Sequence, residues 1–260
     1  MKILFIGDVY GEPGRIILAN NLEKLRNNHE VDFTIVNCEN MTNGRGLNKK
    51  HYEATRKLNI DAITMGNHIF GQNEIFDYLN EDDIIIRPLN GHPNWPGKGV
   101  RIFTVQNKKI AVINILGMTG GMQATTNPFV AFDLIYAEIK NSCDYIFVDF
   151  HAELTSEKIA FGHHLDGRAS AVVGTHTHVP TADNRVLIGG TAYISDVGMT
   201  GPLDGVIGVK KEIIIQRFLK NYPARFEVAK GRKQLNAVII EINDATGYCK
   251  SIERIHINEV

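Results

Sequence analysis

Short apolar runs rich in isoleucine and valine alternate along this chain with longer segments of helical periodicity. Runs of this length and composition are typical of buried β-strands. The runs that we expect to form strands are Lys2–Ile6, Asp32–Asn37, Ala62–Met65, Ile84–Ile86, Arg101–Gln106, Lys109–Leu116, Tyr145–Phe150, Ala171–Val173 and Thr191–Ser195. The segments that we expect to form helices are Gly14–Asn27, Lys49–Lys57, Gln72–Asn80, Val130–Asn141 and Glu157–His164.

The order of these elements predicts the fold class. Strands and helices alternate in the first half, which favours parallel strands joined by crossover helices. The stretch "VQNKKIAVI" instead has the pattern of a hairpin with Asn107-Lys108 at its turn, and two further strands joined by Asn243–Gly247 end the chain. The chain has no repeat and no linker-like break, so we expect one α/β domain over residues 1–260 with parallel and antiparallel parts.

Composition narrows the class of protein. The 260 residues are 43% hydrophobic and 22% charged, as in globular proteins with a core, and the net charge of −1 gives no general attraction to nucleic acid or anionic membranes. Three scattered cysteines without a CxxC indicate a reducing compartment and no thiolate zinc site. The apolar run in "MKILFIGD" is too short for a signal peptide or a membrane span. We therefore expect a cytoplasmic protein with no membrane segment.

Side chains that can bind a metal directly follow five of the expected strands. The carboxyl ends of strands line the crevice where ligands bind in open α/β sheets, so these side chains are expected to meet. Taken singly, each has a structural explanation: Asp8 as a helix N-cap, Asn67-His68 as the cap of the helix at Gln72, His151 as a buried histidine. Coincidence is a poor explanation for five strands that each end in a side chain able to bind a metal. The candidate ligands are Asp8, Glu39, Asn40, Asn67, His151, His176 and His178.

The chemistry of these donors predicts the kind of metal centre. Mixed oxygen and nitrogen donors suit manganese, iron or zinc better than calcium. Seven donors are more than one such ion takes from a protein, whereas two ions sharing a carboxylate would use them all. Such pairs lie roughly 3.5–4 Å apart and bind a phosphoryl group between them. In an extended segment, Thr177 would point away from the ions that His176 and His178 bind.

The motifs that carry these residues read "IGDVYG", "VNCENMTNG", "MGNHIFG", "VDFHAELTSEK" and "VGTHTHVPTAD". The chain thereby resembles the calcineurin-like metallophosphoesterase superfamily and, over nearly its whole length, the YmdB-like branch of it. The resemblance implies a sandwich of two mixed β-sheets flanked by α-helices. It also implies a homo-oligomer of two or more chains.

The resemblance assigns roles to the candidate residues. Tyr10 replaces a histidine ligand that is common in the superfamily, and Glu39 takes the bridging position that is usually aspartate; the branch shares both departures. His68 matches the acid beside the metals. The first metal is implied to take Asp8, Glu39, Asn40 and His178, and the second Glu39, Asn67, His151 and His176.

The resemblance implies hydrolysis of phosphodiesters, with 2′,3′-cyclic or 3′,5′-cyclic nucleotides as the substrates. The expected cofactors are two first-row ions, iron or manganese before zinc. A metal-bound hydroxide attacks phosphorus, and His68 protonates the leaving oxygen with support from a carboxylate or a backbone carbonyl.

Two other functions stay open at this point. A regulatory module that binds a nucleotide or RNA, with weak hydrolysis, is consistent with the lost ligand at Tyr10, although the retained His68 and the net charge argue against it. A mononuclear zinc hydrolase would leave Asp8, Asn40 and Asn67 without a role. The glycine-rich "MTNGRGLNKK" is either a flexible loop or a phosphate-binding loop with Arg45.

Overall fold

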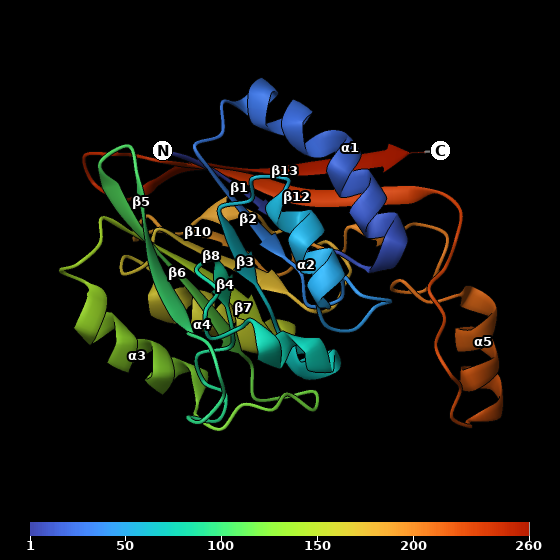
Figure 1. Cartoon of the computed structure of the whole chain (residues 1–260). Coiled ribbons are helices and arrows are strands. Elements are labelled where there is room, and N and C mark those ends of the chain that lie inside the picture. The colour runs from blue at the N-terminus through green and yellow to red at the C-terminus, as the bar shows by residue number, and fades with distance from the viewer. Residues whose placement is uncertain (260) are drawn as a thin grey trace.

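The computed structural model describes residues 1–259 as two β-sheets packed face to face with helices on their outer faces (Figure 1). The first sheet has the order β11-β12-β1-β2-β3-β4, with β13 paired to β12, and the second has the order β5-β6-β7-β8-β10-β9. The strands of the first sheet are β1 (Lys2–Ile6), β2 (Phe33–Asn37), β3 (Ala62–Thr64), β4 (Ile85–Ile86), β11 (Gly201–Pro202), β12 (Lys233–Ile242) and β13 (Cys249–Glu259). Those of the second are β5 (Val100–Val105), β6 (Lys108–Leu116), β7 (Tyr145–His151), β8 (Ala171–Thr175), β9 (Arg185–Val186) and β10 (Ala192–Ile194).

Both sheets are mixed, as expected. Strands β1 to β4 run parallel and β12 runs antiparallel to β1, while β6, β7, β8 and β10 run parallel and β5 and β9 run antiparallel to their neighbours. The fold is therefore the two-sheet sandwich that the resemblance implied.

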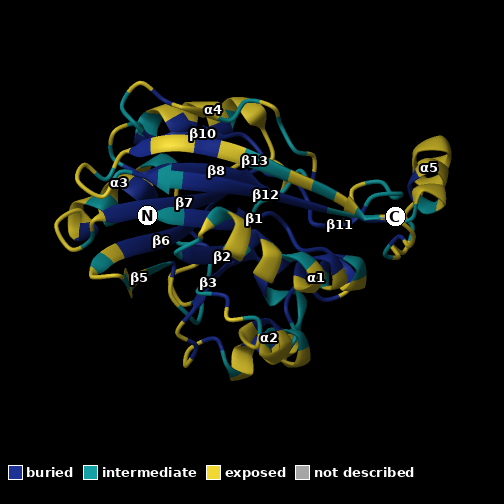
Figure 2. Ribbon diagram, turned by 90° about the horizontal axis from the view of Figure 1, so that it is seen from above, coloured by how far each residue is buried: buried dark blue, intermediate teal, exposed yellow. Residues whose placement is uncertain are grey.

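Apolar side chains of the two sheets form the core between them. Phe5 and Val238 of the first sheet pack with Phe147 and Val173 of the second, and the rings of Phe5 and Phe147 are 5.4 Å apart between centroids. Figure 2 shows these strands as buried and the helices as exposed on their outer sides. The sheets hold each other by hydrophobic burial, so their strand ends are fixed relative to one another.

Five helices flank the sandwich or stand at its edge. The helices α1 (Gly11–His29) and α2 (Lys49–Arg56) cover the first sheet, and α3 (Pro128–Ile139) and α4 (Thr155–Leu165) cover the second. The fifth helix, α5 (Lys211–Lys220), stands away from the body (Figures 1 and 2). None of the helices in residues 1–259 combines the length and the apolar character that a membrane crossing requires.

Three local predictions are wrong. The segment Gln72–Asn80 forms the 3₁₀ turns of η2 (Asn73–Asp77) instead of an α-helix, because it lacks a side-chain cap and contains poor helix formers. The hairpin between β5 and β6 turns at Gln106-Asn107, one residue earlier than predicted, because both residues adopt positive φ. The helix Lys211–Lys220 was not predicted at all.

Candidate metal centre

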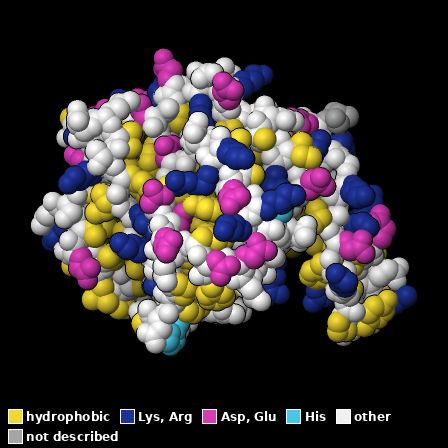
Figure 3. Space-filling model, viewed as in Figure 1, with side chains coloured by type: hydrophobic (Ala, Val, Ile, Leu, Met, Phe, Trp, Pro, Cys, Tyr) yellow, Lys and Arg dark blue, Asp and Glu magenta, His cyan; other side chains and the backbone are white. Residues whose placement is uncertain are grey.

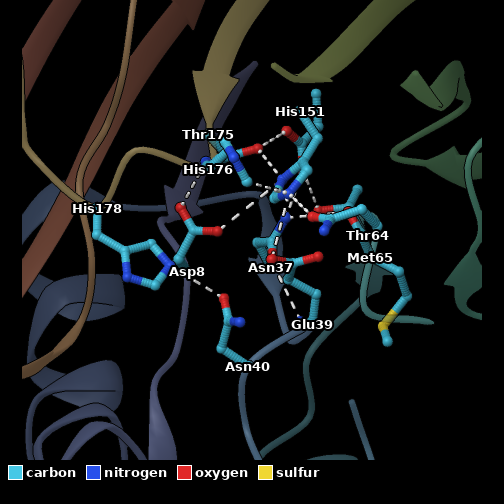
Figure 4. Close-up of polar contacts among 12 residues, drawn as sticks. Asp8, Asn37, Glu39, Asn40, Thr64, Met65, His151, Thr175, His176 and His178 are labelled. Carbon is cyan, nitrogen blue, oxygen red and sulfur yellow. Dashed lines mark hydrogen bonds and ion pairs between the residues drawn. The ribbon is translucent and has the colours of Figure 1, made fainter. Parts of the chain in front are cut away.

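The seven candidate ligands lie together at one edge of the sandwich, where β1, β2 and β3 of the first sheet end beside β7 and β8 of the second (Figure 4). Parallel strands deliver their carboxyl ends to the same edge, and the packed sheets bring two such edges together. Four of the ligand side chains are almost completely buried: Asp8, Glu39, Asn40 and His151 expose 2% or less. The site is therefore built into the protein interior instead of on a mobile surface loop.

The acidic and histidine ligands form two overlapping groups that could each hold a metal ion. Glu39, His151 and His176 offer ligand atoms that all lie within 4.8 Å of one another. Asp8, Glu39 and His178 form the second group with the same spacing. Glu39 belongs to both groups, which is the position a bridging carboxylate must take.

Three atoms that can accept a hydrogen bond converge on one ring nitrogen of His151 in the first group. The Nε2 atom of His151 lies 3.2 Å from Glu39 Oε1, 2.9 Å from Asn67 Oδ1 and 3.1 Å from His176 Nδ1. A ring nitrogen donates at most one proton, so it satisfies at most one of these three acceptors. Lone pairs that converge without protons between them are the arrangement that a cation stabilises.

Asp8 has an oxygen free to bind a cation, and Gly66 leaves space beside two of the other ligands. The Oδ1 atom of Asp8 is buried and has no hydrogen-bond partner, whereas its Oδ2 accepts from the backbone N–H of His176 at 3.2 Å. A Cβ atom on Gly66 would lie 2.2 Å from Glu39 Oε2 and 2.6 Å from His151 Nε2, so only glycine leaves this space open. The unpaired oxygen and the open space show that these residues fit a metal centre.

The buried carboxylates of the centre favour a positive charge beside them. Burial raises the pKa of Asp8 well above its ordinary value. Burial also opposes a charge on His151, but the carboxylates of Glu39 and Asp8 outweigh it and raise the pKa of His151 to about 9. In the metal-free chain a proton on His151 thus supplies part of the positive charge that the carboxylates need.

Neighbouring groups orient two of the ligands. The Nδ1 of His178 is 3.0 Å from the carbonyl oxygen of Ile207, so an Nδ1–H donates there and leaves Nε2 free, 3.2 Å from Asn40 Oδ1. The side-chain amide N–H of Asn40 donates to the carbonyl of Gly44 at 3.0 Å, which turns its oxygen toward the site. Outer contacts of this kind fix the tautomer and the direction of metal ligands.

A buried polar network behind His151 was missed by the sequence reasoning. The Nδ1 of His151 is 2.9 Å from the hydroxyl of Thr175, and this hydroxyl donates to Asp149 Oδ1 at 2.6 Å. The other oxygen of Asp149 accepts from Asn37 Nδ2 at 2.9 Å and from the hydroxyl of Thr64. Because Thr175 gives its proton to Asp149, it accepts from Nδ1–H of His151, and Nε2 is the nitrogen that a metal can bind once it has lost its proton. The one sequence signal was an aspartate inside an apolar strand, in "IFVDFH".

We expect Thr175→Val to weaken metal binding about 10–100-fold while the sandwich still folds, because outer-shell partners of metal-bound histidines have effects of this size. The variant should also lose about 1–3 kcal/mol of stability, since one buried oxygen of Asp149 loses its donor. Metal titration and thermal unfolding measure the two effects. Thr175→Ser keeps the hydroxyl and serves as the matched control; equal metal affinity in the two variants would contradict this role.

A buried ion pair holds the loop that carries His176 and His178. The Nζ atom of Lys158 lies 2.6 Å from Asp196 Oδ2, and it also donates to the Thr175 carbonyl at 2.8 Å. Asp196 accepts from the backbone N–H of Thr177 at 3.0 Å and from its hydroxyl at 2.8 Å. Thr177 therefore points away from the ligands, as predicted, but the reason differs: the backbone is not extended, because φ is +100° at His176 and +67° at His178. Strained backbone of this kind is often found at functional sites.

His68 lies half-buried beside the ligands, and its backbone N–H donates to Glu39 Oε2 at 3.1 Å. Burial lowers the pKa of His68, and the charge of Glu39 partly opposes this effect. Within residues 1–259 its ring has no hydrogen-bond partner, so the supporting group that we predicted is not present; Glu39 is the nearest opposite charge that acts on it. Arg45 is exposed and close enough to His68 to lower its pKa further.

Tyr10, which the resemblance places where the superfamily has a histidine, lies beside His178. Its ring meets the ring of His178 edge-on, with 5.5 Å between centroids, and it exposes 7% of its surface. The side chain of Asn40, which follows β2, contacts the ring of His178. Asn40 is therefore placed to replace the ligand that Tyr10 cannot supply.

The fold and the site define a calcineurin-like metallophosphoesterase. The chain belongs to the YmdB-like protein family, whose sequence model matches residues 4–255. It is 50% identical over 259 residues to the 2′,3′-cyclic-nucleotide 2′-phosphodiesterase of Bacillus subtilis, covering 100% of this chain and 98% of that protein.

Solved structures agree with this classification. A crystal structure described as a novel phosphatase from Mycoplasma pneumoniae is 40% identical and has a TM-score of 0.94, covering 99% of this chain and 93% of the other. A hypothetical protein from Thermus thermophilus is 37% identical with a TM-score of 0.92, and both chains are covered completely. The chain is thus an enzyme of the phosphoric ester hydrolase class.

Proposed function

We propose that this chain hydrolyses cyclic nucleotides, 2′,3′-cyclic nucleotides first among them, at a centre of two first-row metal ions. The substrate follows from the Bacillus subtilis relative, which is similar over the whole chain. The observation that carries the proposal is the position of Glu39 in both ligand groups, together with the unpaired oxygen of Asp8.

We assign the ligands as the family resemblance implied. Glu39 would be shared by the two ions; Asp8, Asn40 and His178 would hold one of them with it, and Asn67, His151 and His176 would hold the other. A mixture of oxygen and nitrogen donors suits iron or manganese, and zinc is the third choice. When bound, two such cations polarise the phosphoryl oxygens and lower the pKa of a water molecule enough for it to attack phosphorus.

The protein residues position the reacting groups. The backbone N–H of His68 donates to Glu39, which keeps its partly exposed ring beside the ligands, where it can protonate the leaving oxygen. Arg45 is exposed and lies close enough to His68 to lower its pKa, so its guanidinium is available to a phosphate oxygen.

The regulatory alternative has little support among these observations. Positive and negative side chains are interspersed on the face in Figure 3, which is not the surface of a typical RNA-binding protein. The expected homo-oligomer stays a prediction.

Metal-dependent turnover of 2′,3′-cyclic AMP tests the proposal. The chain is stripped with a chelator, reloaded with Mn²⁺ or Fe²⁺, and assayed with 2′,3′-cyclic AMP and 3′,5′-cyclic AMP. We expect activity toward the 2′,3′ diester to disappear on stripping and return on reloading. A fully loaded chain that hydrolyses neither diester would contradict the proposed function.

A further inference from the structure

A hollow of about 220 Å³ opens directly beside the metal ligand His178. Its wall includes Val179 and Pro180 from the loop after β8, Leu203 and Ile207 from the loop after β11, and Gln234 from β12. Most of these side chains are apolar. Pockets for drug-sized ligands measure about 300–1,000 Å³, so this hollow suits one ring system of a larger molecule.

The hollow lies at the same edge of the first sheet as the metal centre. Strand β12 pairs with β1, which ends at Ile6, two residues before Asp8. The N–H of Gly7 donates to the Asn236 carbonyl at 3.0 Å, two residues from Gln234. His178 borders both the hollow and the centre. A ligand whose phosphate lies at the metal centre can therefore extend past His178 into the hollow.

Ile207, at the wall of the hollow, is held in an unfavourable conformation. It and Gly208 have φ of +44° and +99° and form a two-residue turn between Val206 and Val209, which are joined by reciprocal backbone hydrogen bonds of 2.8 and 3.0 Å. Asparagine followed by glycine is preferred in such turns, and a β-branched residue there is strained. The side chain of Ile207 is 51% exposed, so burial within the chain does not offset the strain. The backbone of Ile207 has a role within the chain, since its carbonyl accepts from Nδ1 of His178 at 3.0 Å, whereas its exposed apolar side chain is available to contact a ligand.

Gln234 supplies a polar group to the same hollow. Its side-chain amide forms no hydrogen bond in the described part of the chain. A glutamine amide can pair with two atoms on the edge of a nucleobase, as it does with adenine N6 and N7. An apolar wall with one free amide is the chemistry that recognises a heteroaromatic base.

We propose that the hollow binds the nucleobase of the cyclic nucleotide, with Ile207 packing against the ring and Gln234 pairing with its edge. This subsite rests on the proposed function, because the phosphate must lie at the metal centre. It makes Ile207 and Gln234 residues that determine specificity among phosphodiesters, whereas the metal ligands act on every diester.

Two substrates separate base recognition from hydrolysis. 2′,3′-Cyclic AMP carries the base, and methyl β-D-ribofuranoside 2,3-cyclic phosphate replaces it with a methoxy group. We expect Ile207→Asn to lower the ratio of kcat/KM for the nucleotide to that for the base-free diester about fivefold to tenfold, through loss of apolar contact. We expect Gln234→Leu to lower it about threefold to tenfold through loss of a hydrogen bond.

Stability provides an independent readout for Ile207→Asn. Asparagine is favoured in this turn, so the melting temperature of the variant should equal or exceed that of the wild type. Ile188→Asn is the matched control: Ile188 is fully exposed on the turn between β9 and β10, outside the hollow, and its substitution should leave the ratio unchanged. If neither Ile207→Asn nor Gln234→Leu lowers the ratio, the subsite is wrong although the enzyme is active. A loaded wild type that hydrolyses neither diester overturns the proposed function and the subsite together.

Discussion

Glu39→Ala should lose both metal ions and reduce phosphodiester hydrolysis to the level of the metal-free chain. Glu39 is the one residue in both ligand groups, and its two oxygens lie against His151 on one side and the His68 backbone on the other. Without this carboxylate, neither group keeps enough negative charge to hold an ion near a second one. Elemental analysis should show a fall from about two metals per chain to almost none.

The control for this variant is Glu23→Ala, which removes an exposed carboxylate from α1 far from the centre. It should keep the full metal content and activity. A Glu39→Ala protein that still carries two ions would show that another group bridges them, and the assignment of Glu39 would then be wrong.

His68→Ala should keep both metal ions but lose about 10²–10⁴-fold in turnover of 2′,3′-cyclic AMP, the usual contribution of a positioned acid. The ring of His68 has no partner in residues 1–259, so its removal leaves no buried group unpaired and the ligands stay in place. The loss should be smaller with bis(p-nitrophenyl) phosphate, because p-nitrophenolate leaves as a stable anion without a proton. Steady-state kinetics on both substrates, with elemental analysis of the same samples, measures these effects.

His92→Ala, at an exposed position in the loop before β5, is the matched control and should behave as the wild type. Equal losses on the two substrates would mean that His68 does not protonate the leaving group. Full activity of His68→Ala would remove it from the mechanism.

The sequence predicted the strands and the candidate ligands because both depend on local patterns. An apolar run that ends in Asp8 or His151 is visible without the fold, and parallel strands bring such ends to one edge. The packing of two mixed sheets came from the resemblance, and the strand order was not predicted, since long-range pairing leaves no short pattern in a single sequence.

The residues that sequence reasoning missed depend on contacts between distant segments. Thr175 and Asp149 are 26 residues apart and join only because β7 and β8 are neighbours. Gly66 is ordinary in sequence, and its importance comes from the two ligand atoms that a Cβ would strike. The strained turn at Ile207 likewise runs against local preference, which is why no pattern predicted it.

The most direct test of the central claim is a crystal structure of the manganese-loaded chain with anomalous diffraction data. Our account predicts two anomalous peaks roughly 3.5–4 Å apart, with the Glu39 carboxylate between them and Asp8 and His151 on opposite sides. A single peak held by His151 and His176, with Asp8 and Asn40 left unbound, would contradict a two-metal centre and favour a mononuclear hydrolase.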